Sequence, residues 1–327
     1  MKTIAIFAGG NSSEREISLS TAGQIFNFID KKLFNAYIID VKGFEWNLVE
    51  GSNRYPVDKN TFSCTVGSKE IRFDFVWNAI HGKPGENGQV QGYFDMLQIP
   101  YSSCSLLTSA LTFNKFMCKT YLQKQGIPMA QSVMVTAETA VDMDEIVETL
   151  GLPLFVKPNT SGSSFGVSKV KKKEELIDAL NIAFVEDPEV VIESFIQGTE
   201  VSCGVFKSQK NTYLLPITEI VTANEFFDYE AKYHSKLTQE ITPARINDEV
   251  AKKIHKYTSA IYDALYCKGI VRVDYIINGD TPYFLELNSI PGMSTESIVP
   301  KQIRTAGYNI TDILTEVIED ALAKHML

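Results

Sequence analysis

The sequence predicts an α/β protein with more than one domain, and three observations lead to this prediction. The chain has 327 residues, which is long for a single hydrophobic core. Hydrophobic residues make up 44% of it and charged residues 22%, the proportions of an ordinary globular protein. Short apolar runs alternate with helical or irregular stretches from the N-terminus onward, which is typical of α/β folds. We therefore expect two or three domains.

Composition argues against several classes of protein. A formal charge of −9 argues against nucleic acid or anionic lipid as the main partner. The five cysteines are scattered and form no C-x-x-C pair, which indicates reduced, mostly buried thiols. The apolar run near Met1 is too short for a secretory signal, and no run approaches the ~18 apolar residues of a spanning helix. We expect a cytoplasmic protein without nucleic-acid or membrane partners.

The first part of the chain is expected to form an α/β unit that ends near residue 105. Gly9 and Gly10 end the first apolar run, and a capping box then opens a helix. The expected elements are strands at residues 4–8, 37–41 and 73–79 and a helix after Ser13-x-x-Glu16.

The middle of the chain is organised around a glycine- and serine-rich turn at residues 159–166. Its small residues let a polyphosphate approach the backbone, the hydroxyls of Ser163 and Ser164 can donate, and Lys157 can neutralise charge. A flexible hairpin without a ligand explains the same pattern, and neither a P-loop nor a dinucleotide fingerprint is present. The expected elements are helices at 113–125 and 174–184 and strands at 154–157, 167–170, 190–193 and 200–206.

The last third of the chain predicts a lid, a helix and a β-hairpin. The polar, aromatic segment at residues 222–243 lacks periodicity and is longer than usual connections, which indicates a lid or binding loop. Apolar residues at helical spacing predict a helix from Ala251 to Leu265. Strands at 270–277 and 282–288 are expected to form a hairpin around Asn278-Gly279-Asp280.

The predicted hairpin carries the sharpest candidate site. Arg272 and Asp274 are two residues apart and face one side of a strand, and so do Glu286 and Asn288. If residues 279–281 close the hairpin, Asp274 lies opposite Glu286 and Arg272 opposite Asn288. Two carboxylates and an amide oxygen would then suit Mg²⁺ held jointly with ATP phosphates, beside a guanidinium that could stabilise a transferring phosphoryl group. A one-residue slip would separate the pairs, and a solvated face with chance charges is the alternative.

Two loops are further candidate ligand sites. The loop at residues 81–88 follows a predicted strand, at the edge where open α/β sheets bind ligands. A lone histidine such as His81 is more often structural than catalytic, and three glycines can simply form a turn. The proline–glycine turn at residues 288–294 could hold a small substrate or an oxyanion, although turn chemistry alone explains Pro291 and Gly292.

Read in order along the chain, these motifs form a specific set. The blocks are Gly9-Gly10-x-Ser12-x-Glu14-Arg15-Glu16-x-Ser18, His81-Gly82-x-x-Gly85-Glu86-x-Gly88, Asn114-Lys115, Val156-Lys157-Pro158, Gly162-Ser163-Ser164-x-Gly166, Asp228-Tyr229-x-x-Lys232-Tyr233, Arg272-x-Asp274 and Glu286-x-Asn288-x-x-Pro291-Gly292-Met293. Together they resemble the D-alanine–D-alanine ligases of the ATP-grasp superfamily. The resemblance covers nearly the whole chain, with every block in the family order.

The resemblance implies three α/β domains, with ATP gripped between the central and the C-terminal ones. We place them at residues 1–105, 106–190 and 191–327, the last with the lid at 222–243. The resemblance also implies a homodimer.

The same resemblance implies roles for individual residues. Contacts to ATP are implied for Lys115, Lys157, Ser163, Ser164 and Lys232 at the phosphates, and for Glu193, Ser194, Ile196 and Glu200 at adenine and ribose. Ligands to two Mg²⁺ (or Mn²⁺) ions are implied for Asp274, Glu286 and Asn288. Contacts to the two D-alanine molecules are implied for Glu14, His81, Arg272, Gly292, Ser297 and Ile298.

The implied mechanism runs through an acyl phosphate. The carboxylate of the first D-alanine attacks the γ-phosphate, and the amine of the second displaces phosphate. A lid must exclude water, and Tyr233, hydrogen-bonded toward Ser163 and Glu14, would complete the closed site. In related ligases that use D-lactate a histidine commonly replaces this tyrosine, so Tyr233 favours D-alanine as the acceptor. The chain departs from the family pattern at residues 159–161, where an arginine and an acid are common.

Two rival functions remain at this point. The first is another ATP-grasp carboxylate–amine ligase, or a D-alanine–D-lactate ligase, with the same nucleotide chemistry. The second is a non-catalytic sensor on the same fold, although a retired enzyme need not keep Arg272, Asp274, Glu286 and Asn288 together.

Overall fold

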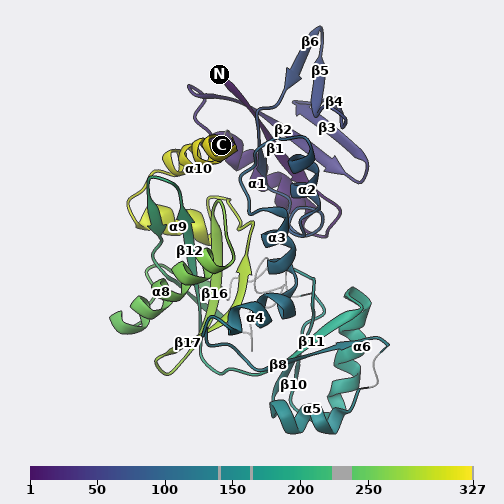
Figure 1. The fold of residues 1–327 in the computed structure, drawn as a ribbon, viewed down its shortest axis with the longest axis vertical. Coiled ribbons are helices and arrows are strands. Elements are labelled where there is room, and N and C mark those ends of the chain that lie inside the picture. The colour runs from purple at the N-terminus through teal and green to yellow at the C-terminus, as the bar shows by residue number, and fades with distance from the viewer. Residues whose placement is uncertain (139–140, 163–164, 223–237, 326–327) are drawn as a thin grey trace.

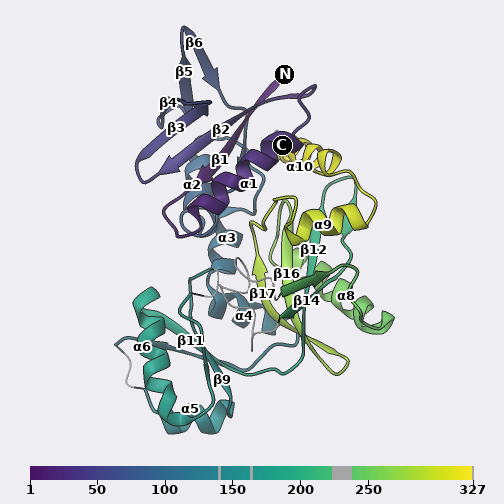
Figure 2. The ribbon, with the colours of Figure 1, turned by 180° about the vertical axis from the view of Figure 1, so that it is seen from behind.

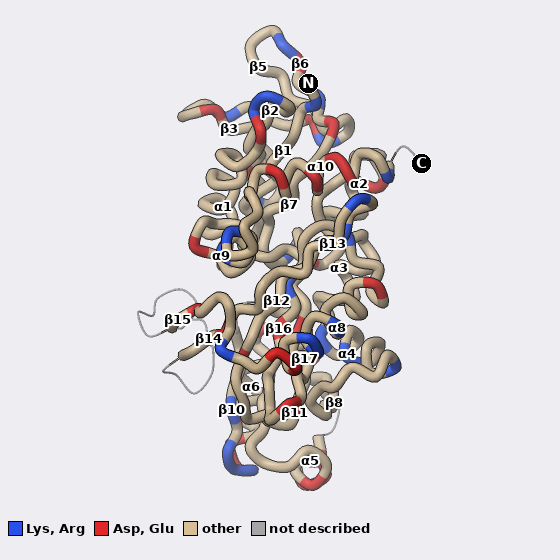
Figure 3. Tube along the Cα trace, turned by 90° about the vertical axis from the view of Figure 1, so that its left-hand side faces the viewer, with Lys and Arg blue, Asp and Glu red and all other residues tan. Residues whose placement is uncertain are grey.

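The computed structural model describes residues 1–138, 141–162, 165–222 and 238–325. Three sheets follow one another along the long axis of the molecule, with the third sheet between the first and the second (Figure 1). Acidic and basic residues of the described chain are interspersed, without one continuous basic stripe (Figure 3). No described helix is both long and apolar enough to cross a membrane.

The first sheet contains seven strands among the described residues. In spatial order they are β6 (Lys69–Arg72), β5 (Ser63–Val66), β4 (Asn53–Asp58), β3 (Glu45–Glu50), β2 (Phe34–Lys42), β1 (Lys2–Gly9) and β7 (Phe75–Asn78). Strand β1 pairs in parallel with β2 and β7, and β2 to β6 form an antiparallel extension. The strands predicted near residues 4–8, 37–41 and 73–79 are confirmed, whereas β3 to β6 were not predicted.

Helices cover both faces of this sheet, because β1 is apolar on both sides. Ile4 and Ile6 pack with α1 (Arg15–Phe28) and α10 (Ile310–His325), while Phe7 packs with α2 (Gln89–Met96). The described ends of the chain therefore lie close together, with α10 beside α1 (Figure 2).

The second sheet has four strands, in the order β10 (Ser168–Val170), β9 (Leu154–Pro158), β11 (Glu189–Ser194) and β8 (Ser132–Thr136). On one face, Leu154 and Val156 pack against α5 (Met143–Leu150) and α6 (Leu176–Glu186), which a 3₁₀ turn (Lys173–Glu175) precedes. Because side chains alternate along a strand, Phe155 and Lys157 face the other way, toward the third sheet. The predicted strands and the helix near residues 174–184 are confirmed.

The third sheet is antiparallel, with α8 (Asp248–Ala264) and α4 (Lys115–Gln123) on its apolar face. Its strands are β15 (Thr238–Ile241), β14 (Thr218–Thr222), β12 (Thr199–Lys207), β16 (Val271–Asn278) and β17 (Thr281–Asn288), and β13 (Thr212–Leu214) also pairs with β12. The helix predicted from Ala251 to Leu265 corresponds to α8, and its Ile254 and Ile261 are buried as expected. Helix α9 (Ile298–Thr305) lies against β12 from the other side.

The helix predicted at residues 113–125 is interrupted at its start. Asn114 leaves the helical conformation and its side chain accepts a hydrogen bond from the Met117 backbone N–H at 2.9 Å, so it caps α4. The preceding turns form a separate helix, α3 (Leu106–Phe113), which was not predicted.

The β16–β17 hairpin has the predicted register but not the predicted turn. Arg272 lies opposite Asn288 and Asp274 opposite Glu286. Only two residues, 279 and 280, connect the strands, and the pairing shifts by one residue beyond Asp274, where Leu285 is the extra residue of a β-bulge. The expectation that three residues close the hairpin was therefore wrong. The two-residue turn alone would pair Asp274 with Leu285. The extra residue in the bulge moves the pairing by one, so Asp274 still lies opposite Glu286.

Candidate active site

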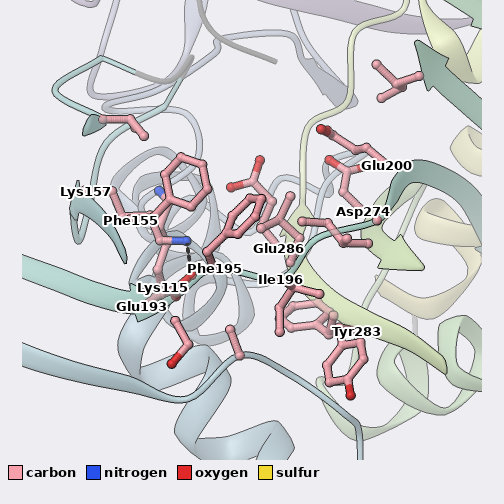
Figure 4. A pocket seen from close by; sticks show the side chains of 18 of the residues that line it. Lys115, Phe155, Lys157, Glu193, Phe195, Ile196, Glu200, Asp274, Tyr283 and Glu286 are labelled. Atoms are coloured by element: carbon pink, nitrogen blue, oxygen red, sulfur yellow. Dashed lines mark hydrogen bonds and ion pairs between the residues drawn. The ribbon is translucent and has the colours of Figure 1, made fainter. Parts of the chain in front are cut away.

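Two cavities meet in the interior of the molecule. The first, of about 550 Å³, lies between the second and third sheets and is shown in Figure 4. The second, of about 600 Å³, lies between the first domain and the third sheet. Both are lined by Lys115, Arg272 and Glu286, together with the Ser161-Gly162 segment of the glycine-rich turn. A group bound in one cavity can therefore reach a group bound in the other at this junction.

The β16–β17 hairpin supplies the acidic wall of the first cavity. The carboxylate of Asp274, 4% exposed, accepts hydrogen bonds from Ser202 Oγ at 2.6 Å and Asn288 Nδ2 at 2.8 Å. It also accepts two bonds of 2.8 Å from the Arg272 guanidinium, which approaches it in a bidentate manner. Burial alone would lower the pKa of Arg272, but the carboxylates of Asp274 and Glu286 raise it, so the guanidinium stays charged. The bulge aims Glu286 at the same cavity.

These residues fit the chemistry of a magnesium site. The described residues contain no cluster of three or more His, Cys, Asp or Glu side chains placed to hold a metal by themselves. Asp274, Glu286 and Asn288 instead provide two carboxylates and one amide on a shared face. Mg²⁺ commonly takes one or two carboxylates and completes its shell with water and substrate phosphates. The set therefore suits an ion that arrives with a nucleotide.

The second sheet and α4 supply the basic wall. Lys157 on β9 donates to Glu193 Oε2 at 2.7 Å, and Lys119 on α4 donates to the other oxygen of the same carboxylate. Lys115, one helical turn before Lys119, donates to the carbonyl of Ser161. Two ammonium groups thus face the cavity around one carboxylate.

The buried carboxylate keeps its charge. Burial would raise the pKa of Glu193, but the ammonium groups of Lys119 and Lys157 lower it to about 2. Burial, reinforced by the nearby Lys157, lowers the pKa of Lys119 to about 8 in spite of the attraction to Glu193. At neutral pH Glu193 is therefore anionic and most Lys119 is cationic. The contacts of the Glu193 carboxylate are to these lysines, and its predicted contact to adenine or ribose stays a prediction.

Another part of the cavity wall is apolar. Ile196 lines it together with aromatic rings of both sheets, and the ring centroids of Phe155 and Phe195 are 5.9 Å apart (Figure 4). Glu200 lies on β12 near Asp274, on the opposite side of the cavity from Phe155 (Figure 4). The Ser194 hydroxyl donates to the carbonyl of Leu150 at 2.8 Å. A flat, apolar base fits between such walls, with a polar ribose toward Glu200.

Glu14 and His81 lie in the second cavity, where a small zwitterion would meet them. Glu14 is 9% exposed and immediately precedes α1. His81 is buried, and within the described part of the chain its Nε2 atom has no hydrogen-bond partner. Burial lowers the pKa of His81, the Glu14 carboxylate opposes this, and Arg272 adds to the lowering, so the imidazole is neutral at pH 7. A neutral, unpaired ring nitrogen beside a carboxylate is suited to a polar ligand.

The opposite side of the second cavity is the N-terminus of α9. The Ser297 and Ser294 hydroxyls lie 2.7 Å apart, and Ile298 begins the helix. A Cβ on Gly292 would lie 2.8 Å from Ser297 Oγ, so a larger residue here would require the Ser297 hydroxyl to move. Unsatisfied N–H groups at a helix start attract carboxylates.

Arg15 fixes the loop that carries Glu14. Its guanidinium donates to the carbonyl of Val41 and to Asp40, each at 2.6 Å. A Cβ on Gly9 would lie 2.4 Å from the Arg15 guanidinium, which explains a glycine at the end of β1. The sequence motif therefore encodes a packing requirement of the loop that carries Glu14.

Sequence reasoning missed the roles of Lys119 and Glu86. Lys119 follows Lys115 by four residues, which places both on one helix face and was the available signal.

Glu86 lies in the second cavity and accepts the Gly82 N–H at 2.7 Å. Burial and the Glu14 carboxylate raise the pKa of Glu86 to about 7. Its motif was noted, but nothing in the sequence indicated a shifted pKa.

Four predicted site residues lie outside the described residues. They are Ser163, Ser164, Lys232 and Tyr233. The ends of the predicted lid are strands, because β14 and β15 pair up to Thr222 opposite Thr238. The segment 223–237 between them lies outside the described residues. The remaining predicted site residues all line one cavity or the other.

Comparison with known proteins agrees with this geometry. The sequence-family model for the D-ala D-ala ligase N-terminus matches residues 3–104. The family model for the D-ala D-ala ligase C-terminus matches residues 121–319. A D-alanine–D-alanine ligase of Phocaeicola vulgatus is 49% identical over 322 residues, covering 98% of this chain and 99% of that protein.

Solved structures match over the same length. The D-alanine–D-alanine ligase of Bacillus anthracis complexed with ATP has a TM-score of 0.81 at 31% identity, covering 100% of this chain and 99% of that one. VanG, a D-Ala:D-Ser ligase of Enterococcus faecalis, has a TM-score of 0.86 at 33% identity, covering 97% and 98%. The chain belongs to the D-alanine–D-alanine ligase family and has its ATP-grasp fold.

Proposed function

We propose that this D-alanine–D-alanine ligase binds ATP in the first cavity and two D-alanine molecules in the second, and makes the dipeptide for peptidoglycan precursors. One observation carries the proposal: the cavities share Lys115, Arg272 and Glu286. An ATP phosphate must leave one cavity and reach a carboxylate in the other, and the charges needed for that transfer lie at their junction.

The nucleotide would use both walls of the first cavity. Lys115 and Lys157, with Lys232, Ser163 and Ser164 from outside the described residues, would contact the phosphates. The adenosine would lie near Glu193, Ser194, Ile196 and Glu200. Asp274, Glu286 and Asn288 would hold two Mg²⁺ (or Mn²⁺) ions, which neutralise charge on the phosphates when bound.

The first D-alanine would be held by its ammonium at Glu14, with the neutral His81 beside it. Its carboxylate oxygen attacks the γ-phosphorus as the bond to ADP breaks, which gives an acyl phosphate. The Arg272 guanidinium stabilises the charge that develops on the transferring group. Glu14 and His81 leave the carboxylate facing the junction of the cavities, where this attack takes place.

The second D-alanine would bind at the start of α9. Its carboxylate accepts from the Ser297 hydroxyl and the Ile298 N–H, which leaves its amine facing the acyl phosphate. After loss of a proton the amine attacks the acyl carbon, and the carbon–oxygen bond to phosphate breaks. The Gly292 N–H and Arg272 stabilise the tetrahedral oxygen. Tyr233 would close the site toward Glu14 and Ser163.

We also propose a cytoplasmic homodimer. Its support is two exposed apolar side chains on helices that contact each other: Met96 at the end of α2 is 80% exposed and Leu107 on α3 is 72% exposed. Exposed apolar side chains that gather on one face commonly mark protein–protein contacts. Light scattering on the purified protein measures the assembly directly. Twice the chain mass is expected, and the chain mass alone would contradict the dimer.

Phosphate release tests the reaction. The purified protein with ATP and Mg²⁺ should release phosphate with D-alanine alone and form D-alanyl-D-alanine in equal amount. D-serine, D-lactate and L-alanine are the comparison substrates, each tested alone and with D-alanine. Release with one of these in preference to D-alanine would replace the proposed acceptor. ATP binding without release in any mixture would support a sensor instead.

A further inference from the structure

Lys119 is a buried charged group that the proposed mechanism does not use. Its side chain is 3% exposed, and it lines the first cavity from α4. Lysine is rarely buried to this extent unless it is paired. Among the described residues its ammonium pairs with the Glu193 carboxylate, which also binds Lys157.

The three lysines of this wall have different partners. Lys115 donates to the Ser161 carbonyl of the glycine-rich turn, so it is tied to the segment expected to carry phosphate. Lys157 is bound to one oxygen of Glu193 at 2.7 Å, and Lys119 is bound to the other. Two positive charges and one negative charge therefore leave the group Lys119–Glu193–Lys157 with one surplus positive charge.

The surplus depends on Lys119. With Lys157 as the sole cation, the Glu193 pair would be neutral, and moving the Lys157 ammonium toward a phosphate would leave a buried carboxylate unpaired. An uncompensated buried charge is strongly unfavourable. With Lys119 in place, Glu193 keeps a partner while Lys157 turns to the nucleotide.

We infer that Lys119 is a positioning residue: it neutralises Glu193 and so keeps the Lys157 ammonium available to the ATP phosphates. This inference rests on the proposed function of the first cavity as the ATP site. Lys119 itself contacts no substrate in this scheme. It acts on nucleotide affinity through Glu193.

The first test removes the Lys119 charge. In Lys119→Met, Lys157 should be trapped on Glu193, so KM for ATP rises about tenfold or more while kcat changes by less than about threefold. Lys119→Arg, which keeps the charge, should stay within about threefold of the wild type in KM. The matched control is Lys124→Met, the loss of an exposed lysine at the C-cap of the same helix, and it should not alter KM.

The second test removes the charge that Lys119 is inferred to neutralise. In the double variant Lys119→Met/Glu193→Gln, Lys157 no longer faces a carboxylate, so KM for ATP should return to within about threefold of Glu193→Gln alone. If Lys119 served only to hold α4 against β11, KM for ATP should not recover in the double variant, because removing both partners does not restore the lost contact. Equal defects in Lys119→Met and the double variant, or an unchanged KM in a folded Lys119→Met, would overturn the inference.

Nucleotide binding without D-alanine separates this inference from the proposed reaction. Titration calorimetry with ATP and Mg²⁺ should show the same loss in Lys119→Met and the same recovery in the double variant. If the wild type binds ATP but forms no dipeptide, the proposed function fails while the titration still tests Lys119. Should Lys119→Met not fold, Lys119→Gln is compared with Lys119→Arg, and equal affinity of these two would contradict the inference.

Discussion

The two walls of the first cavity carry opposite surpluses of charge. On the wall formed by the second sheet and α4, Lys119 and Lys157 surround the single carboxylate of Glu193. On the wall formed by the β16–β17 hairpin, the carboxylates of Asp274 and Glu286 lie near the single guanidinium of Arg272. A magnesium–ATP complex is itself divided in this way, with phosphate anions on one side and cations on the other. At the proposed ATP site, the difference between the walls would therefore orient the complex as well as bind it.

The largest effect is expected from breaking the acidic wall. Glu286→Gln keeps the size of the side chain but removes its charge, so turnover should fall about 10³-fold while thermal unfolding stays cooperative. Steady-state phosphate release measures this. Glu249→Gln, at a side chain on α8 that is 77% exposed and lines neither cavity, is the matched control and should turn over normally. Normal turnover in Glu286→Gln would contradict the metal assignment.

Arg272→Lys keeps the single positive charge of the acidic wall but loses the two-bond geometry on Asp274. A lysine ammonium cannot reproduce the planar fork that places two bonds of 2.8 Å, so kcat should fall about 10²-fold with a smaller change in KM for ATP. Single-turnover measurements of ADP formation check whether the loss lies in phosphoryl transfer. A kcat within about twofold of wild type would show that charge alone is sufficient.

The comparison is sharpened by a change that touches neither wall. Ser297→Ala should raise KM for the acceptor D-alanine about tenfold and leave KM for ATP unchanged, because Ser297 lines only the second cavity. Initial rates over a wide range of D-alanine concentration separate the two sites. Thr295→Val, which removes a hydroxyl bound to Gln24, serves as the control. A matching rise in KM for ATP would mean that the cavities are not independent.

The last expected effect is on stability, with the smallest effect on activity, and it concerns pH and Glu86. The folded state raises the pKa of this carboxyl from 4.5 to about 7 through burial and the Glu14 carboxylate. Between these values the folded protein binds a proton that the unfolded chain has released, so this group lowers stability as pH rises from 5 to 7. The unfolding free energy of Glu86→Gln, measured in urea on the ligand-free protein, should therefore rise relative to wild type by about 2 kcal/mol between pH 5 and pH 7. A constant difference between the two proteins at pH 5 and pH 7 would contradict the raised pKa.

Local patterns predicted about half of the described strands, because apolar alternation is a local property, and β8 and β13 to β15 were among those missed. Strands β3 to β6 escaped prediction because they are short and partly exposed, and Pro56 stands within β4. The predicted pairing of Asp274 with Glu286 is correct although the predicted length of the turn is wrong. The turn is one residue shorter than predicted, and the bulge at Leu285 compensates for this. The consecutive apolar residues Phe284 and Leu285, which break the alternation, were the signal for it.

The site was predicted by resemblance more than by residue pattern. Arg272, Asp274, Glu286 and Asn288 could be placed on one face from spacing alone. Contacts between distant elements could not, because the meeting of Lys119 on α4 with Glu193 on β11 depends on how helix and sheet pack. The raised pKa of Glu86 likewise depends on burial and on Glu14, a residue far away in the sequence.

The packing of α10 on the first sheet has a consequence for biosynthesis. Ile313, Leu314 and Val317 complete the apolar layer that begins with Ile4 and Ile6, so β1 is covered by a helix that is synthesised after all the other described strands. Until α10 has been synthesised, this apolar layer of the first sheet stays exposed to solvent and to chaperones. Termination of translation before α10 would thus leave a fragment that contains every strand of the first sheet but is prone to aggregate through its exposed apolar layer.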